Sequence, residues 1–309
     1  MIADRPFLGV LLMLAFCIVT PLGDAVAKLL GQTVPIGEFL LFRFAIQAAL
    51  LIPLVWAGNR PWRMRRRVFY IVGLRTLMHL FGIGMMVTAL KYLPLANAVS
   101  IVFVMPFMLL ILGRFVLNEE IGATRLIACA VGFCGTLLVV QPSFATVGWR
   151  ALLPLGVALN FSIFMLITRK IAKETDPIGL QAVSGIIAVV VLVPVLAFFS
   201  HSNFAPLALI RPSGVDLELL IAIGLIGTIS HLLMIWSLRY APSATLAPMQ
   251  YLEIPVAALL GWMVFSDLPN PLTLLGISIT MAAGLYVMIT ERANHRRLRP
   301  VPEAPAQPV

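Results

Sequence analysis

The chain has 309 residues, of which 61% are hydrophobic and only 11% are charged, and its mean hydropathy is +1.01. A soluble globular protein has about 25% charged and about 45–50% apolar residues, and so few charges could not cover this much apolar surface in water. The composition therefore excludes a soluble globular protein and indicates an integral membrane protein.

Apolar segments of about 17–25 residues, separated by charged or Pro-, Gly- and Asn-rich breaks, predict membrane-spanning helices. Their connections are mostly short and leave no room for a soluble catalytic or receptor domain. The alternating polarity of transmembrane β-strands is absent. We therefore predict an all-α integral membrane protein with ten transmembrane helices, at 7–27, 36–57, 69–90, 95–117, 122–140, 149–168, 178–199, 216–238, 243–265 and 271–290.

Basic residues contribute most to the net charge of +9, and they concentrate on one side of this predicted topology. The run RPWRMRRR at 60–67 and the basic segment after Glu291 both fall on the side of the N-terminus. The positive-inside rule then predicts that both termini are cytoplasmic. Because the run at 60–67 lies between two spans, it favours a topology determinant or a contact with anionic lipids over nucleic-acid binding. The end of the chain, 291–309, is basic and then Pro-rich, which predicts a disordered cytoplasmic tail.

The sequence repeats itself. KLLGQTVPIG at 28–37 and KIAKETDPIG at 170–179 begin 142 positions apart, and LKYLPLANAV at 90–99 pairs with LRYAPSATLA 148 positions later. We infer that the first five predicted spans are duplicated as the last five. Because five is odd, the second copy is inverted in the membrane relative to the first. Inverted repeats are typical of secondary transporters, although channels also contain them.

Two blocks of the sequence resemble a known superfamily. They are KYLPLANAVSIVFVMPFMLLILGRFVLNEEIG at 91–122 and its counterpart YLEIPVAALLGWMVFSD at 251–267. Both are similar to the drug/metabolite transporter (DMT) superfamily, in particular its ten-helix EamA-type members. The resemblance implies two EamA repeats, at 7–140 and 149–290. The segment PLGDAVAKLLG at 21–31, followed by EFLLFRF, is similar to a bacterial branch that includes riboflavin and S-adenosylmethionine uptake carriers, which implies a bacterial inner membrane.

Polar residues within spans are candidate functional residues, because an ionisable group at the middle of a helix costs about 2.5–3.5 kcal/mol on insertion scales. Glu253 lies about ten residues into the span at 243–265, and its counterpart 148 positions earlier is the neutral Met105. Gln250 lies one turn away on the same face. Glu253 is therefore either a structural glutamate bonded to neighbouring helices, or a residue of a cavity wall or one that titrates protons.

Asp24 and Arg43 lie near the predicted outer ends of the first two spans. An Asp24–Arg43 ion pair, acting as a gate or clamp, is one interpretation, and direct contact with substrate is the other. Gln47 extends the same polar stripe one turn further into the membrane.

His79 and His231 fall on corresponding helices of the two repeats but one turn out of register. They are either hydrogen-bonded structural residues or members of a proton relay. We expect no metal site, because no cysteine or carboxylate lies at ligand spacing from them. Asn160 and Trp236 are further candidates for a cavity wall, and Trp236 alternatively belongs to an interfacial aromatic belt.

These features predict a secondary transporter that moves a small organic metabolite by alternating access. An enzyme is not expected, because no HExxH, GxSxG or Walker A motif is present, and no filter loop supports a channel. No cofactor is expected, and the predicted partners are the substrate and the lipid bilayer. A cavity with acids, histidines, amides and an aromatic ring suits a flat heterocycle. Riboflavin uptake is the favoured prediction; S-adenosylmethionine uptake and amino-acid export are the alternatives.

Overall fold

The computed structural model describes residues 6–105, 107–108, 112, 123–171, 174–199, 205–212, 214–240 and 247–297. Within these residues all regular secondary structure is helical, and no strand is present. The helices are α1 (Pro6–Leu30), α2 (Ile36–Ala57), α3 (Arg66–Leu90), α4 (Leu95–Val102), α6 (Ala123–Val147), α7 (Leu153–Ile171), α8 (Pro177–Phe199), α9 (Gly214–Tyr240), α11 (Glu253–Phe265) and α12 (Pro271–Arg297), with 3-10 turns η1 (Gly148–Leu152), η2 (Ala205–Leu207) and η3 (Ala247–Leu252).

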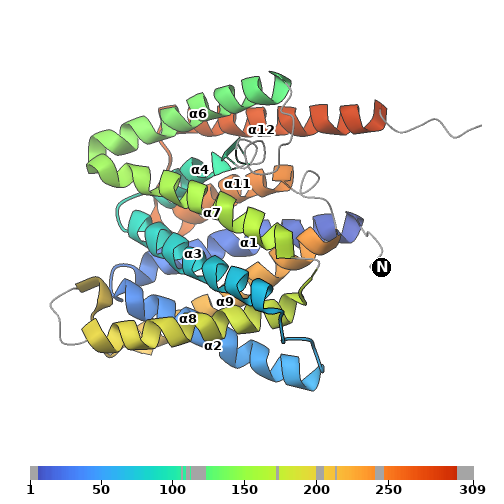
Figure 1. Cartoon of the computed structure of the whole chain (residues 1–309). Helices are drawn as coiled ribbons and strands as arrows, with labels where there is room; N and C mark the ends of the chain where they lie inside the picture. Colours follow the sequence, from blue (N-terminus) through green and yellow to red (C-terminus); the bar gives the residue numbers. More distant parts are fainter. Residues whose placement is uncertain are drawn as a thin grey trace, which may run out of the picture.

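The observed helices confirm the predicted all-helical membrane fold. Six described segments are long and apolar enough to cross a membrane, and one of them, 130–168, continues from α6 into α7. Gly148, with a φ of +64°, lies at the turn where the chain folds back between these two helices (Figure 1). The segments 250–265 and 271–283 are shorter apolar helices. The count of ten spans stays a prediction, because most of 109–122 and all of 241–246 lie outside the described residues.

The final helix is longer than the sequence analysis predicts. α12 continues beyond residue 290 as far as Arg297, so the described part of the predicted disordered tail, 291–297, is helical. This segment contains alanine, glutamate and arginine, which have high helix propensity and can extend a helix that is already formed. The remainder, 298–309, lies outside the described residues.

Two of the predicted spans contain a break at equivalent positions. α4 ends at Val102 and a turn follows at Phe103, while α11 begins at Glu253 after the turn η3. Pro255 accounts for the second break, because proline fits the first turn of a helix but disrupts a helix interior. The sequence analysis placed Glu253 near the middle of a continuous span. The structure corrects this: Glu253 is the first residue of α11.

Helices from the two repeats pack against each other in pairs: α1 with α9, α2 with α8, α3 with α7, and α6 with α12. In Figure 1, α6 and α12 lie together at the top of the bundle and α2 and α8 at the bottom. Glycines allow the closest approach, since a Cβ atom on Gly276 of α12 would lie only 2.5 Å from the carbonyl oxygen of Gly135 in α6. Small residues serve the same purpose in other membrane helix pairs.

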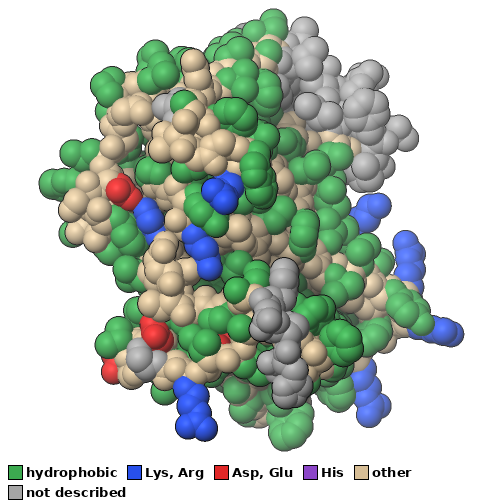
Figure 2. Space-filling view, turned by 90° about the vertical axis from the view of Figure 1, so that its left-hand side faces the viewer, with side chains coloured by type: hydrophobic (Ala, Val, Ile, Leu, Met, Phe, Trp, Pro, Cys, Tyr) green, Lys and Arg blue, Asp and Glu red, His purple; other side chains and the backbone are tan. Residues whose placement is uncertain are grey.

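The surface of the bundle is apolar over the faces that a bilayer would cover. Figure 2 shows one face on which hydrophobic side chains are spread widely. Large apolar side chains project outward, including Phe198, Phe7 and Trp56, which are 80%, 76% and 72% exposed. In water such exposure would be costly, so these faces are suited to lipid.

Candidate substrate cavity

A central cavity of about 160 Å³ lies where α1, α2, α3, α7 and α9 meet η3 and α11. It is bordered by both broken helices, through Val102, Phe103, Gln250 and Glu253. Discontinuous helices surround substrate sites in many transporters, because their free ends supply polar groups at membrane depth. The cavity is smaller than the roughly 300–1,000 Å³ of typical ligand pockets. A metabolite would therefore enter this site only after the surrounding helices move apart.

The structure brings most of the predicted site residues to this one cavity. Seven of them line it, although they come from six different predicted spans: Asp24, Arg43, His79, Asn160, His231, Gln250 and Glu253. Sequence analysis had selected these residues one span at a time, from polarity alone.

Two predicted residues lie elsewhere. Gln47 is fully buried, and its side-chain nitrogen donates a 2.8 Å hydrogen bond to the carbonyl oxygen of Gln181 in α8. Trp236 packs against an apolar cluster that includes Leu51 and Ile178. Both face the contact between α2, α8 and α9 and neither borders the cavity, because packing between helices determines which side of each helix faces inward.

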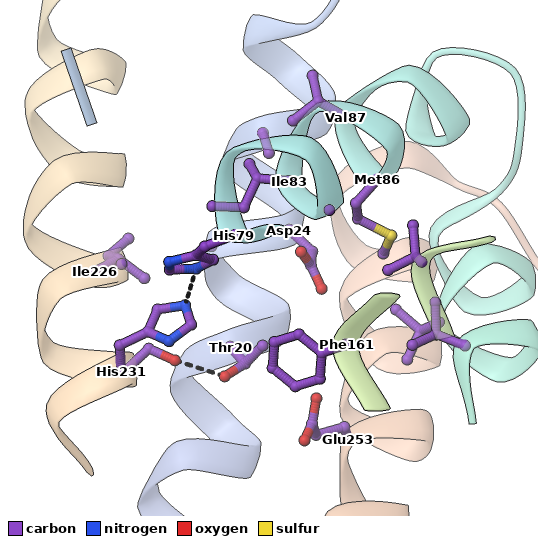
Figure 3. A pocket seen from close by; sticks show the side chains of 18 of the residues that line it. Thr20, Asp24, His79, Ile83, Met86, Val87, Phe161, Ile226, His231 and Glu253 are labelled. Atoms are coloured by element: carbon purple, nitrogen blue, oxygen red, sulfur yellow. Dashed lines mark hydrogen bonds between the residues drawn. The ribbon is translucent and has the colours of Figure 1, made fainter. Parts of the chain in front are cut away.

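Two carboxyl groups point into the cavity from different helices. Figure 3 shows the Asp24 side chain from α1 and the Glu253 side chain from α11 directed toward the space beside Phe161. Glu253 is only 8% exposed. This geometry places Glu253 on the cavity wall, as one of its two interpretations requires.

Asp24 and Arg43 line the cavity together but do not form a direct ion pair in this conformation. Among the described residues, the ion pairs with N···O distances within 4.0 Å are Lys28–Asp267 and Arg60–Asp176. Arg43 is 6% exposed, and its Nη1 atom has no hydrogen-bond partner among the described residues. The charges of Asp24 and Arg43 are still close enough to interact. The predicted gate therefore stays a prediction.

His79 of α3 and His231 of α9 meet on the cavity wall, with 3.0 Å between their Nε2 atoms (Figure 3). The sequence analysis placed them on corresponding helices, one turn out of register. The structure brings their side chains into contact although they are 152 positions apart in the chain. Phe44 and Phe164 pack against the His79 ring, with centroid distances of 5.3 and 4.9 Å.

Arg75 lies within the predicted span at 69–90, but the sequence analysis gave it no role. It is fully buried, and its guanidinium donates hydrogen bonds to Thr168 at 2.7 Å, Ser184 at 3.1 Å and Gln181 at 3.4 Å. It also lies over the ring of Phe164, 4.4 Å from the centroid. The sequence did signal a role for Arg75, because a charged residue within a span is costly. It could not show the hydrogen-bond partners, which lie on α7 and α8, about 90 or more positions away in the chain.

A second pair that sequence analysis missed joins α1 to α9. The hydroxyl groups of Thr20 and Ser230 are 2.6 Å apart on the cavity wall, and either group can be the donor (Figure 3). Thr20 precedes Asp24 by one helical turn, so both share one face of α1; this spacing was the signal available in the sequence. Across the part of the chain that the structure describes, no group of three or more His, Cys, Asp or Glu residues could hold a metal ion.

Two helical repeats that surround one cavity with broken helices and buried charges define a membrane transporter architecture. The sequence matches the EamA-like transporter family over residues 7–141 and again over 148–290. The chain therefore belongs to the EamA-like transporter family, within the superfamily that its sequence blocks resemble.

Two of the curated relatives are named for different substrates. The chain is 27% identical over 269 residues to an S-adenosylmethionine uptake transporter of Rickettsia felis, covering 87% of this chain and 88% of the relative. It is 27% identical over 238 residues to a riboflavin transporter of Rhizobium johnstonii, covering 77% and 73%. A solved crystal structure shares the fold with a TM-score of 0.65 at 16% identity, over 93% of this chain and 99% of that chain.

Proposed function

We propose that this protein is a secondary transporter that carries a small cationic heterocyclic metabolite, of which S-adenosylmethionine is the best candidate. The observation that carries the proposal is the pair of carboxyl groups, Asp24 and Glu253, that face one cavity. A sulfonium ion carries a permanent positive charge, and a buried carboxylate stabilises such a charge far better than water-exposed groups do. Phe16, Phe103 and Phe161 line the same cavity and offer surfaces on which an adenine ring can stack.

Riboflavin, the substrate that the sequence analysis favours, is the second candidate. The observation in its favour is the set of neutral polar groups on the wall, since Asn160, Gln250 and the two histidines can hydrogen-bond an uncharged ring. Relatives in Rhizobium johnstonii and Vibrio cholerae are named riboflavin transporters. A neutral vitamin, however, gives no partner to two acids, so the carboxyl groups favour the cation.

We further infer that the protein lies in a bacterial inner membrane with both termini in the cytoplasm. The first residues of α1 and the last residues of α12 lie at the same end of the bundle (Figure 1). α2 ends at that end too, and the basic run at 60–67 follows it. A positive charge concentration there supports a cytoplasmic location.

The test is transport by purified protein in liposomes, with radiolabelled S-adenosylmethionine and radiolabelled riboflavin measured in separate counterflow assays. We expect saturable counterflow of S-adenosylmethionine. Glu253→Gln should lose most of it while inserting normally, because a charge-assisted contact contributes about 1.5–3 kcal/mol, which is roughly a 10- to 150-fold loss. The matched control is Glu218→Gln, since Glu218 is exposed near the start of α9 and lies outside the cavity.

Each outcome decides between the candidates. Counterflow of riboflavin alone, unchanged in Glu253→Gln, would reject the cation and support the vitamin. Counterflow of neither compound from correctly inserted protein would reject both candidates. Equal loss in Glu253→Gln and Glu218→Gln would show that the effect is not specific to the cavity.

A further inference from the structure

Arg43 is a buried cation whose hydrogen-bonding capacity is not used within the described part of the chain. Its side chain is 6% exposed, its Nη1 atom has no acceptor among the described residues, and the side chain lines the cavity. Its guanidinium carbon lies 5.0 Å from the centroid of the Phe44 ring. Leaving a buried charged donor without an acceptor costs about 1–3 kcal/mol or more. A negatively charged group that reached this guanidinium would recover that cost.

Gly227 of α9 holds the guanidinium in place. A Cβ atom at this position would lie 2.8 Å from Cζ, Nε and Nη2 of Arg43. Only glycine therefore leaves room for the guanidinium to lie flat against α9. The atoms nearest to Gly227 are Cζ, Nε and Nη2, while the Nη1 atom without an acceptor is not among them. The packing of α2 on α9 thus orients this arginine.

Asp24 lines the same cavity, but its carboxyl group does not form an ion pair with Arg43, since the described ion pairs join other residues. The two groups bear opposite charges, and they are further apart than the 4.0 Å of a direct ion pair. A ligand carboxylate bound at Arg43 and a ligand ammonium group bound at Asp24 would neutralise both side chains. An α-amino acid carries a carboxylate and an ammonium group on the same carbon atom. Arginine is suited to the first role, because its planar fork binds carboxylates through two parallel hydrogen bonds.

We propose that Arg43 and Asp24 form a subsite for the zwitterionic α-amino acid headgroup of the substrate. Arg43 binds the carboxylate and Asp24 binds the ammonium group, while Glu253 is left to face the second positive charge. The inference rests on the proposed function and deepens it, because it predicts which part of the substrate each charged residue recognises. It is an alternative to the gate interpretation, in which the two residues pair with each other.

Three adenosine compounds separate the roles of these residues. S-adenosylmethionine has the headgroup and the sulfonium, S-adenosylhomocysteine has the headgroup and a neutral sulfur, and 5′-methylthioadenosine has neither. Binding of each compound to purified protein in detergent is measured by isothermal titration calorimetry. We expect Arg43→Gln and Asp24→Asn each to weaken binding of the two headgroup compounds at least 10-fold. Neither variant should change the binding of 5′-methylthioadenosine by more than about twofold.

Glu253→Gln is the control for position within the cavity. It should reduce the preference for S-adenosylmethionine over S-adenosylhomocysteine and leave the headgroup contribution intact. A charge-swapped pair, Asp24→Arg with Arg43→Asp, should fail to recover binding, whereas a direct gate pair predicts partial recovery. Folding of each variant is checked by its thermal transition in detergent. Gly73→Ala on α3, where no atom lies within 4 Å of the added Cβ, controls for the effect of any substitution in a membrane helix.

The results distinguish failure of this inference from failure of the proposed function. If Arg43→Gln weakens all three compounds equally while wild-type transport of S-adenosylmethionine is intact, the headgroup subsite is wrong and the function stands. If the wild-type protein binds no adenosine compound but binds methionine and S-methylmethionine in an Arg43-dependent manner, the subsite stands and the adenosine substrate is wrong. Recovery of binding in the charge-swapped pair overturns the subsite.

Discussion

His79 and His231 occupy equivalent helices of the two repeats and contact each other directly, with their Nε2 atoms 3.0 Å apart. Phe103 and Tyr251, which are 148 positions apart in the two repeats, also meet, since their rings lie 5.5 Å apart. Contact between equivalent segments is expected where a two-fold axis relating the repeats passes between them. Both pairs therefore mark the line about which the two halves of the transporter are related, and the cavity lies along it.

The histidine contact should contribute a measurable coupling energy. His79→Phe and His231→Phe each remove one ring nitrogen partner, and the double variant removes both. We expect a coupling of about 0.6–1 kcal/mol, the usual range for hydrogen bonds between membrane helices, in a double-mutant cycle. The measurement is the unfolding free energy of the four proteins in mixed micelles. Strict additivity would show that the two rings do not stabilise each other.

Lys28 and Asp267 join the ends of α1 and α11 that lie opposite the chain termini. Lys28 Nζ donates a 2.6 Å hydrogen bond to Asp267 Oδ2 and lies 4.4 Å from the centroid of the Phe265 ring. Because both side chains are partly exposed, at 14% and 35%, the pair contributes up to about 1 kcal/mol. We expect Lys28→Gln to open this end of the cavity about fivefold more often.

The measurement for Lys28 is labelling by an impermeant maleimide. The probe is Ser230→Cys, in a background in which Cys17, Cys129 and Cys134 are replaced by alanine. Asp267→Asn should raise the labelling rate to the same extent, and the reversed pair Lys28→Asp with Asp267→Lys should restore the original rate. Unchanged labelling in both single variants would mean that this ion pair does not hold the end of the cavity closed.

Arg75 should be required for stability and not for the choice of substrate. Its guanidinium joins α3 to α7 and α8 through hydrogen bonds to Thr168, Gln181 and Ser184, and it does not line the cavity. Arg75→Ala leaves these partners unsatisfied, so we expect a loss of about 2–3 kcal/mol in unfolding free energy.

Arg75→Lys should recover only part of that loss, because an ammonium group lacks the planar fork of arginine. Chemical unfolding in mixed micelles measures the effect, and Arg63→Ala, at an exposed position, is the control. Stability equal to that of the wild type in Arg75→Ala would mean that the network contributes little. A changed ratio of affinities between S-adenosylmethionine and S-adenosylhomocysteine would instead place Arg75 in substrate recognition.

Much of this fold is accessible from sequence, because hydropathy and internal repetition are local or pairwise properties of the chain. α2 begins and ends at the limits of the predicted span, 36–57. Its end was predictable because the apolar run stops before Gly58 and Asn59. Polarity within spans also identified Asp24, Arg43 and Glu253 as candidates, since a charged residue inside a membrane is costly and is therefore expected to have a function.

The direction in which each side chain faces was not predictable from sequence. Successive helix positions differ by 100° around the axis, so a small rotation of α9 decides whether Trp236 meets the cavity or the apolar cluster around Leu51. The contact between His79 and His231 could not be predicted either, because the two residues are 152 positions apart and their meeting depends on how the bundle packs.

Gly227→Ala should weaken substrate binding without touching the substrate. The added Cβ atom would lie 2.8 Å from three atoms of the Arg43 guanidinium, so the arginine must move away from the surface of α9. If Arg43 binds the carboxylate of the substrate, we expect about a 10-fold loss of affinity for S-adenosylmethionine, or about 1.4 kcal/mol. Affinity for 5′-methylthioadenosine, which lacks the carboxylate, should stay the same.

The double variant Gly227→Ala with Arg43→Gln tests whether the two changes act through one contact. Because the glycine acts by orienting the arginine, its substitution should have little further effect once the guanidinium is gone, and the losses should be far from additive. Gly73→Ala controls for the general effect of adding a methyl group to a membrane helix. Additive losses in the double variant would show that Gly227 affects binding by another route, such as the packing of α9 against α2.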